Sequence, residues 1–246
     1  MDRWSLVVVF LAVVAVVVGH SLEGGSLAVL WNPAAALIVF AGSGLAAFAQ
    51  MPASYVRPFV SMLSWLVAPT QYSYDGMVNK LVTCGNALRR DGILALERLA
   101  NTETDPTFKK ALTLVVDGYD TDTMRATMEL EFKTRAERDL DIINVLDNLA
   151  GYLPTMGIVG AVLGLMQVLS NIQQPEALAN GIATAFVATF YGVASANLVV
   201  IPIANSLRQH VAIRRRYYES MLIGLLSVKE GTNPMALRFR LQGIVL

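Results

Sequence analysis

The stretch NLAGYLPTMGIVGAVLGLMQVLSNIQQP, residues 148–175, contains no charged side chain and is rich in leucine, valine and glycine. Residues 4–22, 24–56 and 177–207 form three more uncharged stretches of the same character. Each contains a core of roughly 20 residues, the length that an α-helix needs to cross about 30 Å of hydrocarbon. The mean hydropathy is +0.51 and only 15% of the residues are charged, far below an ordinary soluble domain. The sequence therefore predicts an all-α membrane protein with four transmembrane helices.

The basic residues are confined to a few segments of the chain. Lysine and arginine are absent from residues 4–56 and 140–207, and they occur only at Arg3, within residues 57–138 and from Arg208 onward. Segments rich in lysine and arginine stay on the cytoplasmic side of a membrane. We therefore expect both termini and the middle segment to be cytoplasmic, with the two short turns outside.

These boundaries divide the chain into four parts. Residues 1–50 are predicted to form a first transmembrane hairpin and residues 148–206 a second one. Between them, residues 51–147 form a large cytoplasmic insert, and residues 207–246 form a cytoplasmic tail. The insert lacks the period-two alternation of a strand and is expected to be helical, with Asp-Gly pairs as turns between helices. These pairs are Asp75-Gly76, Asp91-Gly92 and Asp117-Gly118.

Conventional catalytic and cofactor motifs are absent from the sequence. No glycine-rich phosphate loop with a following lysine occurs, so ATP is not the expected energy source. The two histidines, His20 and His210, are far apart, which argues against a histidine-based metal site, and no Ser/His/Asp arrangement is credible. Cys84 is the single cysteine, so no disulfide is expected, and no basic face interleaved with aromatic residues suggests nucleic acid. We expect neither an enzyme nor a bound cofactor or metal.

Small residues recur at helical spacing in the third and fourth uncharged stretches. In lipid, small residues let helix backbones approach closely, and packing then drives association. We therefore expect these two helices to form the functional interface, while the first hairpin, with a weaker pattern at Gly42 and Ala46, faces lipid. The alternative is that the small residues serve packing alone. They are Gly157, Gly160 and Gly164 in the third stretch and Ala188, Gly192 and Ala196 in the fourth.

None of the four stretches contains an aspartate, glutamate, lysine or arginine. Proton relays inside membranes normally need an ionisable group. If this protein moves ions, the carboxylate must therefore come from another chain.

Six motifs follow one another in an order and spacing that covers nearly the whole chain. They are Leu22-Glu23-Gly24-Gly25, Ala95-Leu96-Glu97, Leu114-Val115-Val116-Asp117-Gly118-Tyr119-Asp120, Pro154-Thr155-Met156-Gly157-Ile158-Val159-Gly160, Ala188-Thr189-Phe190-Tyr191-Gly192 and Pro202. In this arrangement the chain resembles the MotA/PomA family of the MotA/TolQ/ExbB proton channel superfamily. Members of that family are the larger stator subunits of the bacterial flagellar motor.

The resemblance implies a function and a set of partners. Such a subunit lies in the bacterial inner membrane and surrounds two copies of a MotB-type single-span partner as a homo-oligomeric ring, a pentamer. The partner supplies the channel aspartate and a domain that grips peptidoglycan. Ions cross between the two proteins, and the cytoplasmic insert pushes on a protein of the rotor's switch complex.

The resemblance also implies residues of the ion path. Pro154 and Pro202 match the two functional prolines of the family, and Thr189 matches the threonine that faces the partner's aspartate. Thr155, beside Pro154, is expected to line the same path. Ala161 lies where proton-driven members carry alanine and sodium-driven members carry threonine, so we expect proton coupling.

Rotor contact is implied for a charged pair in the cytoplasmic insert. Arg89 and Glu97 match the family's pair, with Asp91-Gly92 as a turn between them. The neighbouring Arg90 and Arg98 could share or replace this role.

Three other functions are compatible with parts of the pattern. An ExbB/TolQ-type energiser of outer-membrane transport shares the two channel helices, but it normally has three spans and lacks the first hairpin. A membrane scaffold that only oligomerises would use the small residues for packing alone. A self-sufficient secondary transporter would need inverted repeats or a charged mid-membrane residue, and neither is evident.

Overall fold

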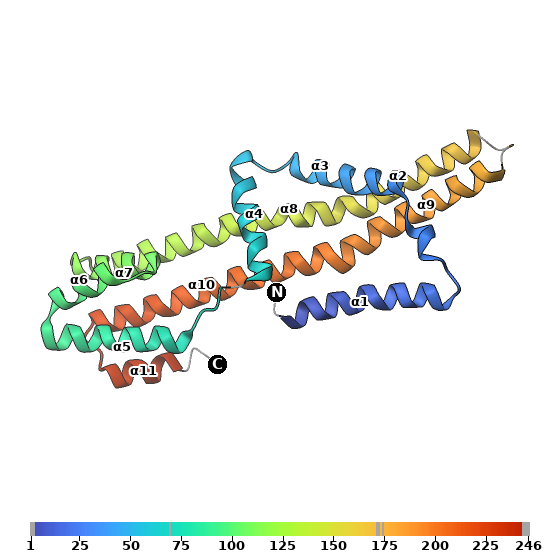
Figure 1. Cartoon of the computed structure of the whole chain (residues 1–246). Coiled ribbons are helices and arrows are strands. Elements are labelled where there is room, and N and C mark those ends of the chain that lie inside the picture. Colours follow the sequence, from blue (N-terminus) through green and yellow to red (C-terminus); the bar gives the residue numbers. More distant parts are fainter. Residues whose placement is uncertain (1–2, 69, 171–172, 174, 243–246) are drawn as a thin grey trace. The chain divides into compact units, whose positions relative to one another are not determined.

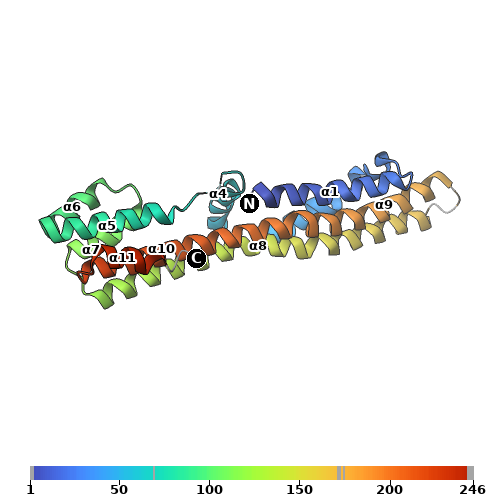
Figure 2. The same cartoon turned by 90° about the horizontal axis from the view of Figure 1, so that it is seen from below.

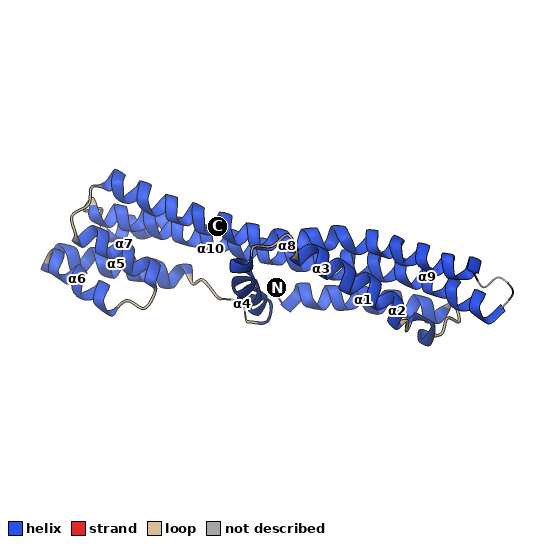
Figure 3. Cartoon of the chain, turned by 90° about the horizontal axis from the view of Figure 1, so that it is seen from above, coloured by secondary structure: helices blue, strands red, loops and turns tan. Residues whose placement is uncertain are grey.

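The computed structural model describes residues 3–68, 70–170, 173 and 175–242 (Figure 1). Within these ranges the chain is helical, with turns and loops and no strand (Figure 3). The prediction of an all-α fold is therefore confirmed. Of the segments expected from the sequence, residues 1–2 of the first hairpin, 171–172 and 174 of the second turn, and 243–246 of the tail lie outside the described residues.

The chain divides into two compact units. Unit 1 comprises residues 1–69 and 140–209, and unit 2 comprises residues 70–139 and 210–246. Two long helices, α8 (Thr121–Ser170) and α10 (Ile201–Lys229), contribute residues to both units. The other elements of unit 1 are α1 (Arg3–Leu22), η1 (Leu27–Leu30), α2 (Pro33–Ala36), η2 (Leu37–Ala41), α3 (Gly42–Phe48), α4 (Ala53–Val67), α9 (Pro175–Ser195) and η3 (Ala196–Val200). Those of unit 2 are α5 (Tyr74–Asp91), α6 (Ile93–Thr102), α7 (Pro106–Val116) and α11 (Pro234–Gln242).

Two helical segments in the described part of the chain are long and apolar enough to cross a membrane. They are Thr121–Ser170 and Leu178–Lys229, and most of the apolar surface of each is exposed rather than buried in the chain. Exposed apolar helices of this length are typical of a membrane protein. Two further apolar helices, Val7–Leu22 and Pro33–Phe48, are shorter. The count of four transmembrane helices therefore stays a prediction.

The helix from Pro175 to Lys229 widens into a π-helical segment, η3, directly before Pro202. A proline ring clashes with the carbonyl of the residue four positions earlier and donates no backbone hydrogen bond. A π-turn accommodates this clash without breaking the helix. By contrast, α8 continues as an α-helix through Pro154. The two prolines thus have different local backbones.

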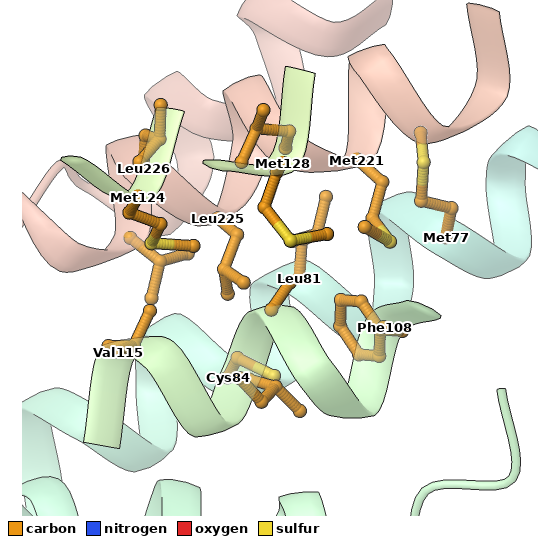
Figure 4. Close-up of a cluster of buried hydrophobic side chains, with 14 of the residues drawn as sticks. Met77, Leu81, Cys84, Phe108, Val115, Met124, Met128, Met221, Leu225 and Leu226 are labelled. Atoms are coloured by element: carbon orange, nitrogen blue, oxygen red, sulfur yellow. The ribbon is translucent and has the colours of Figure 1, made fainter. Parts of the chain in front are cut away.

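Unit 2 contains the main cluster of large buried side chains (Figure 4). Leu81 of α5, Leu96 of α6 and Leu112 of α7 are fully buried, and they meet side chains from α8, α10 and α11. Amphipathic helices bury one apolar face in this way because the hydrophobic effect favours removing that face from water. The burial fixes α5, α6 and α7 as a small helical group.

Turn residues explain where the helices of unit 2 begin and end. Gly92 and Gly118 have positive φ values of 76° and 77°, which glycine adopts without steric cost, so the predicted turns at these two positions are confirmed. The prediction of a turn at Asp75-Gly76 is wrong. Both residues lie in the first turn of α5, because the Ser73 side chain caps that helix by accepting a hydrogen bond from the Gly76 N–H at 3.0 Å.

Candidate functional site

α8 and α9 run side by side in unit 1 (Figure 2), and glycines lie at their contact. A Cβ added at Gly157 would lie 3.0 Å from the Ala188 carbonyl oxygen, and one at Gly164 would lie 2.8 Å from the Gly181 carbonyl oxygen. Distances below about 3 Å leave no room for a methyl group, so the two backbones touch where these glycines lie.

Two more of the small residues lie on the same contact. A Cβ at Gly160 would lie 2.7 Å from the Ala188 side chain, and one at Gly192 would overlap the Leu153 carbonyl group. Ala188 is fully buried. Five of the six small residues that the sequence analysis names on these two helices therefore lie between α8 and α9, and Ala196 is the sixth.

Several large side chains of the same helices are exposed. Ile158 of α8 is 59% exposed and Phe186 of α9 is 74% exposed. An outward face of this kind suits lipid or another apolar surface rather than water.

Three of the candidate ion-path residues lie near one another. Thr189 is half-buried, and its Cα atom would lie 3.3 Å from a Cβ at Gly157. Pro154 lies beside Gly192, with its Cα atom 3.1 Å from a Cβ placed there. Thr155 follows Pro154 directly and is exposed. Pro154, Thr155 and Thr189 therefore occupy one level of the α8–α9 pair.

Two candidate residues lie elsewhere on these helices. Ala161 is half-buried and lies six residues beyond Thr155, about 9 Å along α8. Pro202 is half-buried and lies roughly 20 Å from Thr189 along the helix, at 1.5 Å per residue. The five candidates thus follow the length of the helix pair and do not form one cluster.

The hydroxyl groups of this region bond to their own helices. Thr189 donates to the Ala185 carbonyl oxygen at 3.2 Å, and Thr155 donates to the Tyr152 carbonyl oxygen at 2.9 Å. Each hydroxyl oxygen keeps lone pairs that can accept a hydrogen bond from a protonated carboxyl group or water. The arrangement can therefore assist a proton carrier, although it contains no carrier of its own.

Polar contacts also join the first hairpin to α9. The Asn32 amide donates to Thr184 Oγ1 at 2.7 Å, and the Tyr191 hydroxyl donates to the Leu30 carbonyl oxygen. Tyr191 stacks on Phe40 with ring centroids 5.6 Å apart. The sequence did not predict these contacts between the first hairpin and α9, although polar side chains within otherwise apolar stretches were the available signal.

The candidate rotor residues lie around the turn between α5 and α6 in unit 2. All four side chains are exposed. Arg89 donates to the Gly231 carbonyl oxygen at 2.9 Å, whereas Glu97 makes no ion pair with any described residue. Arg90 pairs with Asp91 at 3.1 Å and is 84% exposed, and its hydrogen bonds lower the pKa of Asp91. Of this pair, the Arg89 guanidinium is therefore held by a hydrogen bond, whereas the Glu97 carboxylate is exposed and forms no ion pair with any described residue.

Unit 2 also holds a buried ionic and aromatic cluster that the sequence did not predict. Arg214 of α10 pairs with Asp139 of α8, and both side chains are mostly buried. Burial raises the pKa of Asp139 although the nearby Arg214 opposes this effect. The rings of Tyr72 and Tyr217 lie 5.0 Å apart, and burial raises the pKa of Tyr72 to about 12. These contacts tie the loop before α5 to α10.

Among the described residues, no group of three or more histidine, cysteine, aspartate or glutamate side chains could hold a metal ion. Cys84 lies in the core of unit 2, where burial raises the pKa of its thiol to about 11. A buried thiol of this kind is a packing group rather than a nucleophile.

Comparison with protein families gives one match, to the MotA/TolQ/ExbB proton channel family over residues 99–220. Among curated proteins, the chain is 31% identical over 242 residues to motility protein A of Bacillus subtilis (strain 168), covering 98% of this chain and 90% of the relative. It is 33% identical over 164 residues to the chemotaxis protein PomA of Vibrio alginolyticus, covering 65% of this chain and 62% of that protein.

Two solved structures have the same fold. The C. jejuni MotAB structure superposes with a TM-score of 0.92 at 27% identity, covering 99% of this chain and 96% of that one. The flagellar MotAB stator complex of Bacillus subtilis gives a TM-score of 0.89 at 31% identity, covering 97% and 94%. The similarity extends over both units and includes the first hairpin.

Proposed function

The chain belongs to the MotA/TolQ/ExbB proton channel family, and we propose that it is the A-type stator subunit of a bacterial flagellar motor. The observation that carries this proposal is similarity along nearly the whole chain to motility protein A and to chains of MotAB stator structures. The ExbB/TolQ-type alternative would share the channel helices but would lack the first hairpin, which is part of the matched length here.

In this proposal the protein lies in the inner membrane with four spans and both termini in the cytoplasm. Its parts are the hairpin of residues 1–50, the cytoplasmic domain of residues 51–147, the channel hairpin of residues 148–206 and the tail of residues 207–246. The absence of lysine and arginine from residues 4–56 and 140–207 supports this topology.

A partner with one membrane span completes the ion path. We assign it to a MotB-type subunit because residues 148–175 and 177–207 contain no ionisable carboxylate of their own. Several copies of this chain would surround that partner as a ring, with five copies as the expected number. One charge that crosses 100 mV releases about 2.3 kcal/mol, which is sufficient to drive a conformational step.

The α8–α9 pair is the part of the chain that would face the partner. Its hydroxyl oxygens at Thr155 and Thr189 can accept hydrogen bonds at one level of the pair. Pro154 borders the same level. Pro202 and the π-helical segment before it give the fourth span a second place at which the helix can bend. We propose that the partner's protonated aspartate docks beside Thr189.

Proton coupling follows from the side chain at position 161. Sodium is a hard cation that needs oxygen ligands in place of its hydration shell, and the Ala161 methyl group offers none. A proton can instead move on a carboxyl group. Swimming speed of cells that use only this stator tests the coupling. Full speed in sodium-free buffer that is abolished by a proton uncoupler is expected, and dependence on sodium would contradict the proposal.

The role of Thr189 is tested by Thr189→Val, which keeps the shape and removes the oxygen. Assembly should be unchanged, and ion flow and swimming speed should fall. Assembly is measured by co-purification of the partner, so a folding defect and a conduction defect are distinguishable. Normal motility of the variant would remove Thr189 from the ion path.

Rotor contact is proposed for Arg89 and Glu97, with Arg90 and Arg98 able to share the role. Arg89→Glu and Glu97→Lys should lower torque without changing membrane insertion. A matched control is Lys133→Glu, because Lys133 is also an exposed cation of unit 2 but lies on α8. If Lys133→Glu lowers torque equally, the effect is one of general charge and not of this turn.

A further inference from the structure

A groove in unit 1 separates α1 from α9 and η3. Its volume is about 500 Å³, within the usual range of about 300–1,000 Å³ for ligand pockets. α1 contacts η1 and η3, and the groove lies between α1 and α9.

The two walls of the groove are almost entirely hydrocarbon. Val13 and Val16 lie on the α1 side, and Phe186, Val187 and Phe190 lie on the α9 side. No aspartate, glutamate, lysine or arginine side chain lines the groove. An apolar cavity of this kind does not hold ordered water, because water needs two or more polar partners.

One end of the groove is polar. His20 lines it at the end of α1, next to the turn that follows this helix, and its Nε2 atom has no hydrogen-bond partner among the described residues. The imidazole lies against the backbone of Gly25, where an added Cβ would come within 2.7 Å of Nδ1. Apart from the Ser195 hydroxyl group, the groove is hydrocarbon along its length and has the His20 imidazole at one end, which is the pattern of an amphiphile.

The size of the groove distinguishes between possible occupants. A membrane-crossing helix is about 10–12 Å across and about 30 Å long, far larger than the groove can accept. A single alkyl chain needs no polar partner along its length and fits a narrow apolar slot. Both walls belong to helices whose apolar surface is exposed in this chain, so bilayer hydrocarbon can enter from the side.

We infer that the groove binds one acyl chain of a membrane phospholipid, with the ester and headgroup region of that lipid at His20. The bound chain fills the gap between α1 and α9 and so completes the packing of the first span. This site is independent of the stator function, since it requires only that unit 1 lies in a bilayer.

Retained lipid can be measured on the full chain, purified with its partner from vesicles of phosphatidylethanolamine and phosphatidylglycerol. The vesicles contain a phosphatidylethanolamine with a diazirine in one acyl chain, and bulk lipid is removed in detergent before irradiation. Mass spectrometry should then find the label on residues 13–17 and 186–190. Label spread evenly over the outward face of α8, around Ile158 and Val162, would overturn the inference.

Two substitutions that fill the groove from opposite walls provide the test of specificity. Ala183→Phe and Val16→Phe should each lower labelling by about tenfold. This is the loss of affinity expected when roughly two methylene groups of the acyl chain are no longer buried in the groove. Ala15→Phe is the matched control, because Ala15 is exposed on α1 and does not line the groove, and it should label as the native chain does.

Two further results would contradict the inference. The first is equal labelling of the native chain and both groove variants. The second is a covalent dimer formed by a photoreactive residue at position 190, which would make a second copy of this chain the occupant. His20→Leu tests the polar end and should also lower retention of the lipid. Unchanged retention would contradict the role of His20.

Discussion

The two units bury different kinds of side chain where their helices meet. Unit 2 places Leu81, Leu112 and Met124 in its interior, and most of its charged side chains are exposed. Unit 1 places Gly157 and Gly164 at the contact of α8 and α9, and several large apolar side chains of these two helices, such as Ile158 and Phe186, are exposed.

The difference follows from the surroundings that each unit requires. In water, burying large apolar groups is the main source of stability. In hydrocarbon, a buried leucine gains little over an exposed one, and close packing of small residues provides the attraction instead. A large-to-small substitution should therefore destabilise unit 2, and a small-to-large substitution should destabilise unit 1. Four changes test this comparison in order of decreasing effect.

The largest effect is expected for Leu81→Ala in unit 2. The Leu81 side chain is fully buried at the centre of the cluster, so its removal leaves a cavity (Figure 4). The free energy of unfolding of unit 2 should fall by about 2–5 kcal/mol. Hydrogen exchange of the α5, α6 and α7 amides in the full chain measures this. Leu94→Ala, at an exposed leucine of α6, is the control and should change stability by less than about 0.5 kcal/mol.

In unit 1, replacing a small residue by a large one is expected to be destabilising. Gly164→Leu places a side chain against the Gly181 carbonyl oxygen and the Ala185 backbone nitrogen, which cannot rotate away. Overpacking of this kind costs about 1–3 kcal/mol. The thermal unfolding temperature of the detergent-purified protein should fall, and motility should be lost. Gly151→Leu on the same helix is the control, because nothing lies within 4 Å of a Cβ there. Equal damage from both changes would reject the close-contact explanation.

A smaller effect is expected at the polar edge of the unit 2 core. Lys80 Nζ donates to both Glu103 carboxylate oxygens at 2.8 and 2.9 Å, and the Asp105 N–H donates to Glu103 Oε1 at 2.9 Å. Burial alone would raise the pKa of Glu103, but these hydrogen bonds and the Lys80 charge outweigh it and lower the pKa. Glu103→Gln should cost about 1 kcal/mol at neutral pH.

The difference in the free energy of unfolding between the native protein and Glu103→Gln should depend on pH with a definite sign. Because the pKa of Glu103 is lower in the folded state, its stabilisation is complete above the unfolded-state pKa of about 4.3 and is lost as pH falls through the folded-state pKa. Urea unfolding of the two proteins should therefore converge in acid. A difference that grows below pH 4 would contradict this assignment.

The smallest effect is expected on the solvated face of α8. Lys133 Nζ lies 3.8 Å from Glu137 Oε1, and the two side chains are 66% and 60% exposed. Lys133→Ala should change the free energy of unfolding by about 0.3 kcal/mol, and less at high salt. A loss comparable to that of Leu81→Ala would mean that this face is covered by another chain.

The sequence was sufficient to predict that the insert is helical, with turns at Gly92 and Gly118, because these features depend on local chemistry. Periodic leucines mark α6 and α7, and glycine at positions 92 and 118 supplies the positive φ that ends a helix. The Asp75-Gly76 turn was predicted wrongly because an Asp-Gly pair also fits a first helical turn. The hydroxyl of Ser73 decides between the two.

The candidate site was only partly predictable for a physical reason. The glycine spacing on α8 and α9 showed which faces would meet, because helical periodicity relates spacing to direction. The bond from Asn32 to Thr184 joins residues 152 positions apart, and no local pattern contains such a pairing. The groove beside α1 depends on how far two helices stand apart, which the sequence of either helix does not state.

The glycine contacts also predict which mutations a second mutation can repair. A methyl group at Gly160 would strike the Ala188 side chain, so Ala188→Gly should restore a strain carrying Gly160→Ala. A methyl group at Gly192 would strike the Leu153 carbonyl group, which every amino acid carries. Every missense change of a glycine codon adds at least that methyl group. Motile revertants of a Gly192 mutant should therefore arise by restoring glycine itself, whereas those of Gly160→Ala should include changes at codon 188.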